Sequence, residues 1–142
     1  MASFAFLVGR ILISIIFILS GLGKFVEFNA NLQFMAAKGM TMAPFFLTVA
    51  AIIEIVGGLS ILLGFFARWG AALLILYLIP VTGIFHDFWM ASDPLVRQME
   101  MIDFLKNLAI IGGLCYVLAV GAGKWCLDSC CGYCHHQHGE KK

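Results

Sequence analysis

The sequence predicts an all-α membrane protein, a bundle of four transmembrane helices with both termini on the same side of the bilayer. Of its 142 residues, 62% are hydrophobic and only 12% are charged, against about 45–50% and about 25% in average soluble domains. A soluble chain of this length could not bury so much apolar surface, because small domains keep much of their surface exposed. A lipid bilayer covers such surface instead, and the length allows one domain core.

Four apolar stretches are long enough to be membrane spans, which need about 20 mostly apolar residues each. They cover residues 4–23, 43–66, 69–85 and 104–121. We interpret the first as a retained span and not a cleaved signal, because no Lys or Arg precedes it and Arg10 interrupts it. Pro44 suits the first turn of the second span, and Pro80 predicts a kink in the third.

The connections between these spans differ in length. Residues 24–42 contain enough apolar side chains to predict an amphipathic turn or helix at the membrane surface. Arg68 and its neighbours leave room only for a tight hairpin between the second and third spans, whereas residues 86–103 form a longer polar connection. Small residues such as Gly57, Gly58 and Gly113 predict close helix–helix approach.

Lys and Arg residues are divided almost evenly between the two sides, so the positive-inside rule favours cytoplasmic termini by a narrow margin. The formal net charge is only +1. No basic stripe that would bind phosphates is present, so we do not expect nucleic acid as a partner.

Glu54 lies near the middle of the second span, where a charge costs roughly 2.5–3.5 kcal/mol on insertion scales. It must therefore be protonated, paired or hydrated. Arg10 lies about two turns into the first span and could approach Glu54 if the two spans are antiparallel neighbours. The functional interpretation is a proton or ligand site in the bundle core. The alternative is an interhelical pair, or a neutral Glu54 with Arg10 extending to the interface.

A second group of polar residues lies at the opposite ends of the spans: Lys24, His86, Asp87, Lys106 and Asn107. Their similar depth in a four-helix bundle predicts that they come within reach of one another. His86 could titrate near neutral pH there, and the group could bind a quinone head group or a small anion. The alternative is that these are helix ends that simply meet water.

The C-terminal tail, residues 126–142, is rich in Cys and His and forms a segment separate from the membrane domain, residues 1–125. Its candidate metal ligands are Cys130, Cys131, Cys134, His135, His136 and His138. Thiolates and imidazoles at this spacing suit Cu(I) or Zn.

Cys131, Cys134 and His135 also fit the C-x-x-C-H pattern of c-type haem attachment. Haem attachment requires an extracytoplasmic tail, which the expected topology argues against. A redox dithiol or a tail without function remain alternatives, and Cys115 within the fourth span is most simply a small apolar residue.

Several short segments resemble the DoxX family of small four-helix membrane proteins. They are Gly9-Arg10-Ile11-Leu12 before Ser20-Gly21-Leu22-Gly23-Lys24, then Glu54-Ile55-Val56-Gly57-Gly58-Leu59, Phe85-His86-Asp87-Phe88-Trp89, Phe104-Leu105-Lys106-Asn107-Leu108 and Gly121-Ala122-Gly123-Lys124-Trp125. The resemblance extends to about Asp128 and does not include the tail. It implies a bundle in the bacterial inner membrane and a loose association with redox work, since some relatives are quinone-linked subunits and others accompany oxidant-defence proteins.

Together these observations favour a redox-associated membrane component that binds a quinone in its core and a soft metal in its tail, with a protein partner in the membrane or at its surface. The alternatives are a non-enzymatic metal-handling or metal-resistance protein, and a membrane scaffold or assembly factor. No nucleophile–base pair, phosphate loop or dinucleotide fingerprint is present. The residues therefore leave open whether the protein catalyses a reaction.

Overall fold

The computed structural model describes residues 2–123, and these form five helices and no strands. In chain order they are α1 (Ala2–Val26), α2 (Phe28–Ala37), α3 (Ala43–Leu63), α4 (Ala67–Phe85) and α5 (Pro94–Val120). All except α2 are long and apolar enough to cross a membrane. The predicted all-α, four-span architecture is thus confirmed for the part of the chain that the structure describes.

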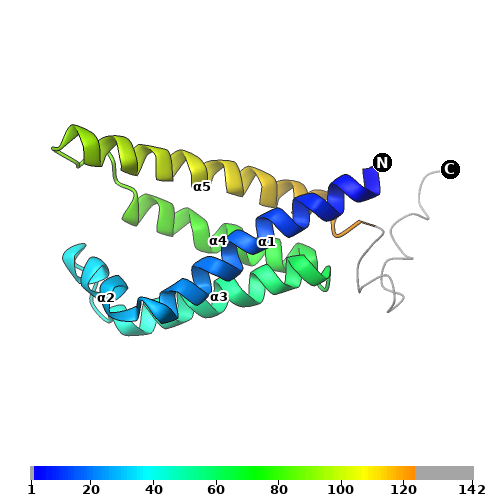
Figure 1. Cartoon of the computed structure of the whole chain (residues 1–142), viewed down its shortest axis with the longest axis horizontal. Coiled ribbons are helices and arrows are strands. Elements are labelled where there is room, and N and C mark those ends of the chain that lie inside the picture. The colour runs from blue at the N-terminus through cyan, green and yellow to red at the C-terminus, as the bar shows by residue number, and fades with distance from the viewer. Residues whose placement is uncertain (1, 124–142) are drawn as a thin grey trace.

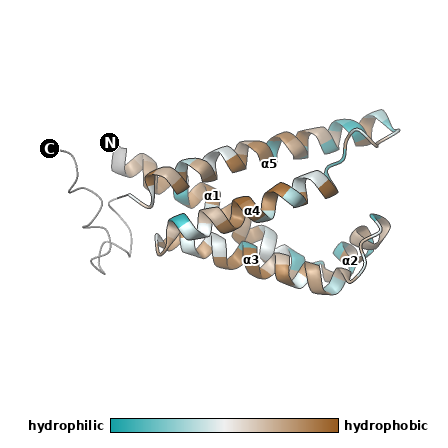
Figure 2. Ribbon diagram, turned by 180° about the vertical axis from the view of Figure 1, so that it is seen from behind, coloured by the Kyte–Doolittle hydropathy of each residue, from teal (hydrophilic) through white to brown (hydrophobic). Residues whose placement is uncertain are grey.

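The four long helices pack in the spatial order α1, α3, α4, α5, and α1 and α5 contact each other only slightly. The start of α1 and the end of α5 lie at one end of the bundle (Figure 1). We call this end, which also holds the α3–α4 turn, the terminal end. The other end carries α2 and the α4–α5 connection, and we call it the α2 end. Hydrophilic residues gather at the α2 end and in the first turns of α5 (Figure 2).

The apolar core lies between the long helices and is centred on Phe17, Ile61, Leu74 and Leu114. Glycine brings the backbones close together, as the sequence predicted. A Cβ atom built on Gly57 would lie 2.6 Å from Cγ of Leu74, so no larger residue fits there without rearrangement. Most other apolar side chains on the long helices face outward, as expected for helices surrounded by lipid.

The connection between α3 and α4 is a tight turn, as predicted. Helix α3 ends three residues earlier than expected, because Gly64 adopts a left-handed conformation (φ 67°) and caps the helix. The hydroxyl of Ser60 donates to the carbonyls of Phe65 (2.6 Å) and Phe66 (3.2 Å) and holds the turn in place. Arg68 lies in the first turn of α4 rather than in the connection.

Helix α5 begins ten residues before the predicted span. The Asp93 side chain accepts a hydrogen bond of 2.8 Å from the Leu95 backbone and Pro94 occupies the first turn, which together start the helix. At 1.5 Å per residue, 27 residues span about 40 Å, more than the roughly 30 Å of a hydrocarbon core. The first turns of α5 therefore extend into the interfacial region.

The segment predicted to lie at the membrane surface does form a helix, α2. Its Met35 is buried against Ala43 and Leu47 of α3, and the ring of Phe34 stacks on Phe85 of α4 with centroids 5.8 Å apart. These contacts fix α2 across the ends of α3 and α4. It is therefore a packed part of the fold at the α2 end.

Candidate functional site

A buried carboxylate held by three helices is the main polar feature within the membrane-spanning part. Glu54 of α3 is only 4% exposed. Its Oε2 accepts a hydrogen bond from Nζ of Lys24 on α1 (2.7 Å), and its Oε1 accepts one from the hydroxyl of Tyr77 on α4 (2.9 Å). We call Lys24, Glu54 and Tyr77 the membrane triad. Both carboxylate oxygens thus have a donor, as a buried charge requires.

Close packing of α1 on α3 places Lys24 beside Glu54. A Cβ atom built on Gly21 would lie 2.7 Å from Cγ1 of Ile55 and 3.0 Å from the carbonyl of Ala51, so this glycine lets the two backbones approach. Lys24 is one turn further along α1 and also donates to the hydroxyl of Ser20 at 2.9 Å. Its side chain keeps 20% of its surface exposed, so the triad is not sealed on the α1 side.

Arg10 does not reach Glu54, although the sequence had suggested that approach. Its guanidinium donates to the carbonyls of Ile61 (3.0 Å), Leu62 (2.8 Å) and Ala122 (2.5 Å). The reason is register: in the antiparallel α1–α3 pair Arg10 lies level with the end of α3, about two turns from Glu54. Helix C-termini carry partial negative charge, so a buried cation is stabilised there.

The polar residues expected at one depth separate into different pairs. Lys24 joins the membrane triad, whereas His86 Nδ1 lies 3.0 Å from a carboxylate oxygen of Glu100 on α5. Lys106 pairs with Asp103 of its own helix at 2.5 Å and is exposed. The five residues of the predicted group therefore do not form one cluster of side chains in contact.

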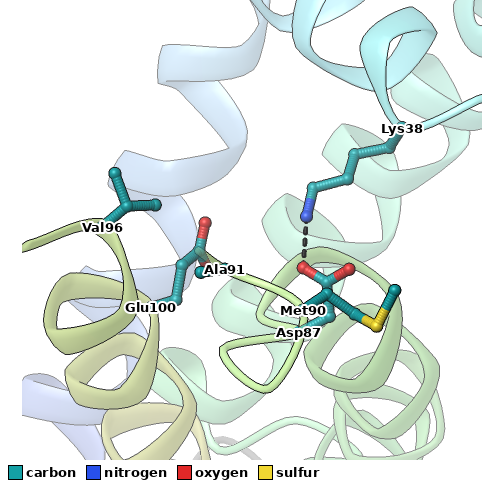
Figure 3. Close-up of a pocket in the computed structure, with 6 residues that line it drawn as sticks. All are labelled: Lys38, Asp87, Met90, Ala91, Val96 and Glu100. Carbon is teal, nitrogen blue, oxygen red and sulfur yellow. Dashed lines mark hydrogen bonds and ion pairs between the residues drawn. The ribbon is translucent and has the colours of Figure 1, made fainter. Parts of the chain in front are cut away.

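A pocket of about 170 Å³ lies at the α2 end (Figure 3). Lys38, at the C-terminus of α2, forms an ion pair with Asp87, and Glu100 lines the other side of the pocket. The hydrogen bond and positive charge of Lys38 hold the pKa of Asp87 below the ordinary value of an aspartate. The pocket is thus a charged surface hollow that links α2, the α4–α5 connection and α5.

Sequence reasoning missed three residues that take part in these contacts: Tyr77, Lys38 and Glu100. A tyrosine within an apolar span carries one polar atom that needs a partner, and this was the available signal for Tyr77. Lys38 and Glu100 gave no comparable signal, because each lies among surface residues whose neighbours depend on how the chain packs.

The candidate metal ligands of the tail lie outside the described residues. Within residues 2–123, no group of three or more His, Cys, Asp or Glu side chains is arranged to hold a metal ion. Cys115 is a free, exposed thiol on α5. The tail metal site accordingly stays a prediction from the sequence.

Four long apolar helices with a buried ion pair between them define an integral membrane protein of the small bundle class. The sequence model of the DoxX family matches residues 5–87. This chain belongs to the DoxX family, in agreement with the resemblance drawn from its motifs.

The chain is similar to two proteins of Escherichia coli strain K12. It is 34% identical over 122 residues to "Inner membrane protein YphA", covering 86% of both chains. It is 32% identical over 122 residues to "Inner membrane protein YqjF", covering 86% of this chain and 88% of that protein. A shorter match, 32% over 78 residues, links 54% of the chain to 26% of the "Surfeit locus protein 4 homolog" of Schizosaccharomyces pombe. No solved structure matches.

Proposed function

We propose that this protein is a redox-associated component of a bacterial inner membrane that binds a quinone at the membrane triad. The observation that carries the proposal is the carboxylate of Glu54, buried in a membrane span and hydrogen-bonded by Lys24 and Tyr77. The inner-membrane location is supported by the names of the two similar Escherichia coli proteins. The redox association is what the family resemblance implies.

The donor set of the triad fits a quinone head group. The Lys24 ammonium and the Tyr77 hydroxyl can each donate a hydrogen bond to a carbonyl oxygen, and Glu54 can accept or release a proton. Reduction of a quinone to a quinol takes up two electrons and two protons. In this proposal the triad exchanges the protons, and a redox partner protein in the membrane or at its surface supplies the electrons.

The free-energy cost of placing the charged residues of the membrane triad in a membrane span supports a functional role. Charges within a membrane span are expensive and, by default, indicate a functional site. A buried ion pair is also weak evidence for stability, because apolar residues of similar volume often serve equally well. Lys24 and Glu54 are therefore better explained by binding than by packing.

Quinone binding can be measured with the purified protein in lipid nanodiscs, using a decyl-substituted benzoquinone and subtracting its partition into protein-free nanodiscs. We expect saturable binding to the wild type and at least a tenfold loss of affinity in both Glu54→Gln and Lys24→Met. Lys106→Met is the matched control, because this lysine makes only an exposed pair within its own helix.

The double variant Lys24→Met with Glu54→Gln separates binding from folding. It removes both charges together and so avoids an unpaired buried charge. We expect its thermal stability to be closer to wild type than that of Lys24→Met, while quinone binding stays weak. Wild-type protein that retains no more quinone than empty nanodiscs would overturn the proposal, as would full binding by the double variant.

A second candidate function, metal handling, rests on the Cys- and His-rich tail. Metal content of the untagged protein, purified from cells supplied with copper and zinc, tests it against a variant that ends at Asp128. Roughly one copper or zinc per chain that disappears with the tail would support a metal site. Equal metal content in both proteins would exclude one in the tail, and a visible haem spectrum would instead indicate attachment at Cys131 and Cys134.

A further inference from the structure

Two largely buried polar side chains of α4 and α5 form no hydrogen bond within residues 2–123. Thr82 is 6% exposed, and its hydroxyl is buried without a hydrogen bond. Asn107 is 8% exposed and its side chain has no hydrogen bond within residues 2–123, but its amide, unlike the Thr82 hydroxyl, is not fully buried. Buried hydroxyl and amide groups are normally paired, because losing water without a replacement partner is unfavourable. The Thr82 hydroxyl therefore needs an explanation, and Asn107 on α5 is a second polar group without a partner among the described residues.

The helix register places both residues near the depth of the membrane triad. Helices α4 and α5 are antiparallel, and two contacts fix their register: Arg68 with the Ala119 carbonyl, and His86 with Glu100. By this register Asn107 lies level with residue 80, and Thr82 is two residues further along α4. At 1.5 Å per residue, both lie within about 8 Å of Tyr77 along the axis of α4.

Asn107 faces the interior of the bundle. It is seven residues before Leu114, a fully buried member of the core, so the two share one face of α5. Glu100 lies seven residues before Asn107 on the same face and is paired with His86. The amide therefore lies on the core-facing side of α5.

Helices α1 and α5 make few contacts with each other. The contacts between α1 and α5 lie at the terminal end, where Phe6 stacks on Tyr116 and Arg10 donates to the carbonyl of Ala122, just beyond α5. From there the two helices diverge toward the α2 end (Figures 1 and 2).

We propose that Thr82 and Asn107 form a second binding wall for the quinone head group, across the bundle from Lys24 and Glu54. A neutral hydroxyl and amide can donate hydrogen bonds to a carbonyl oxygen and accept them from a quinol hydroxyl. One carbonyl of the head group is held by the triad and the other by this pair. The inference rests on the proposed quinone site and adds the residues that orient the head group.

The test uses Thr82→Val and Asn107→Leu, which replace each polar group with an apolar one of similar size. In the nanodisc assay each variant should bind decyl benzoquinone about tenfold more weakly, as expected for one lost hydrogen bond. Without quinone, Thr82→Val should unfold at the same or a higher temperature than wild type, because an unpaired buried hydroxyl has been removed, and Asn107→Leu should unfold at about the wild-type temperature. A structural role would lower that temperature.

Matched controls are Thr48→Val and Asn31→Leu, since both side chains have partners in their own helical turns. Thr48 donates to the carbonyl of Pro44 (2.8 Å) and Asn31 to that of Glu27 (2.9 Å). Neither control should change quinone affinity. A benzoquinone with a photoreactive ring substituent should label the α4 and α5 peptides that contain Thr82 and Asn107 in the wild type.

The outcomes separate the two proposals. If Glu54→Gln weakens binding but Thr82→Val and Asn107→Leu do not, this inference is wrong and the quinone site at the triad stands. Lower unfolding temperatures in both variants would also overturn it, because the side chains would then have structural partners. If the wild type binds no quinone, both proposals fail.

Discussion

The two ends of the bundle hold their polar side chains in different ways. At the terminal end, Arg10 donates to backbone carbonyls at the ends of α3 and α5, and Arg68 donates to the carbonyl of Ala119 (3.1 Å). At the α2 end, ion pairs join side chains of opposite charge, such as Lys38 with Asp87. All six Asp and Glu residues within 2–123 lie at mid-span or toward the α2 end.

The contacts at the two ends differ in whether a change of pH can break them. Guanidinium groups stay protonated at any physiological pH, and carbonyls do not titrate, so the terminal end has a fixed set of hydrogen bonds. The α2 end depends on ion pairs such as that of Lys38 with Asp87, whose carboxylate can gain a proton. The hydrogen bonds of Arg10 and Arg68 therefore hold the helices together at the terminal end, and we call them the clamp. Proton exchange is expected toward the α2 end.

The largest predicted effect comes from breaking the clamp. Arg10→Met removes three charge-assisted hydrogen bonds between α1, α3 and the end of α5. Since each such bond contributes about 1.5–3 kcal/mol, the free energy of unfolding should fall by about 3 kcal/mol or more. Denaturant unfolding in mild detergent measures it.

Lys106→Met serves as the control for Arg10→Met. It removes an exposed pair within α5 and should cost less than about 1 kcal/mol. Equal losses in the two variants would show that Arg10 does not clamp the helices together.

A middle-sized effect is expected from adding one methyl group to the terminal half of the α3–α4 interface. Gly57→Ala places a Cβ within 2.6 Å of Leu74, and overpacking of this kind costs about 1–3 kcal/mol. Gly83→Ala, toward the α2 end of α4, meets open space, so it should be neutral or slightly stabilising because Ala favours helix. Thermal unfolding compares the two variants, and equal unfolding temperatures would show that Gly57 is not tightly packed against Leu74.

The smallest effect is expected at the α2 end. Lys38→Met should raise the pKa of Asp87 toward its ordinary value, because the lost hydrogen bond and charge now hold it down. A lowered pKa contributes stability above the ordinary aspartate range, and that contribution is lost as pH falls through the lowered value. NMR titration of the carboxyl carbon measures the shift, and an unchanged pKa in Lys38→Met would show that the pair does not form in solution.

The sequence predicted much of the fold and less of the site. Apolar runs gave four spans, and Gly57 indicated close packing. The start of α5 was missed because Asp93 and Pro94 were interpreted as part of a polar connection, although together they form a helix start. Glu54 was identified as a residue that needs a partner, but Arg10 was suggested as that partner where the structure has Lys24 and Tyr77.

The sequence by itself determined that the chain spans a membrane four times, because hydropathy and length act locally along each segment. It also determined that Glu54 needs compensation, since an isolated charge is costly in lipid whatever its neighbours. Only the tertiary structure decided which residues provide that compensation. Partner choice depends on the register and order of packed helices, and a shift of one turn moves a side chain by about 5.4 Å, from one partner to another. For the same reason, only packing placed Thr82 and Asn107 near the depth of the triad.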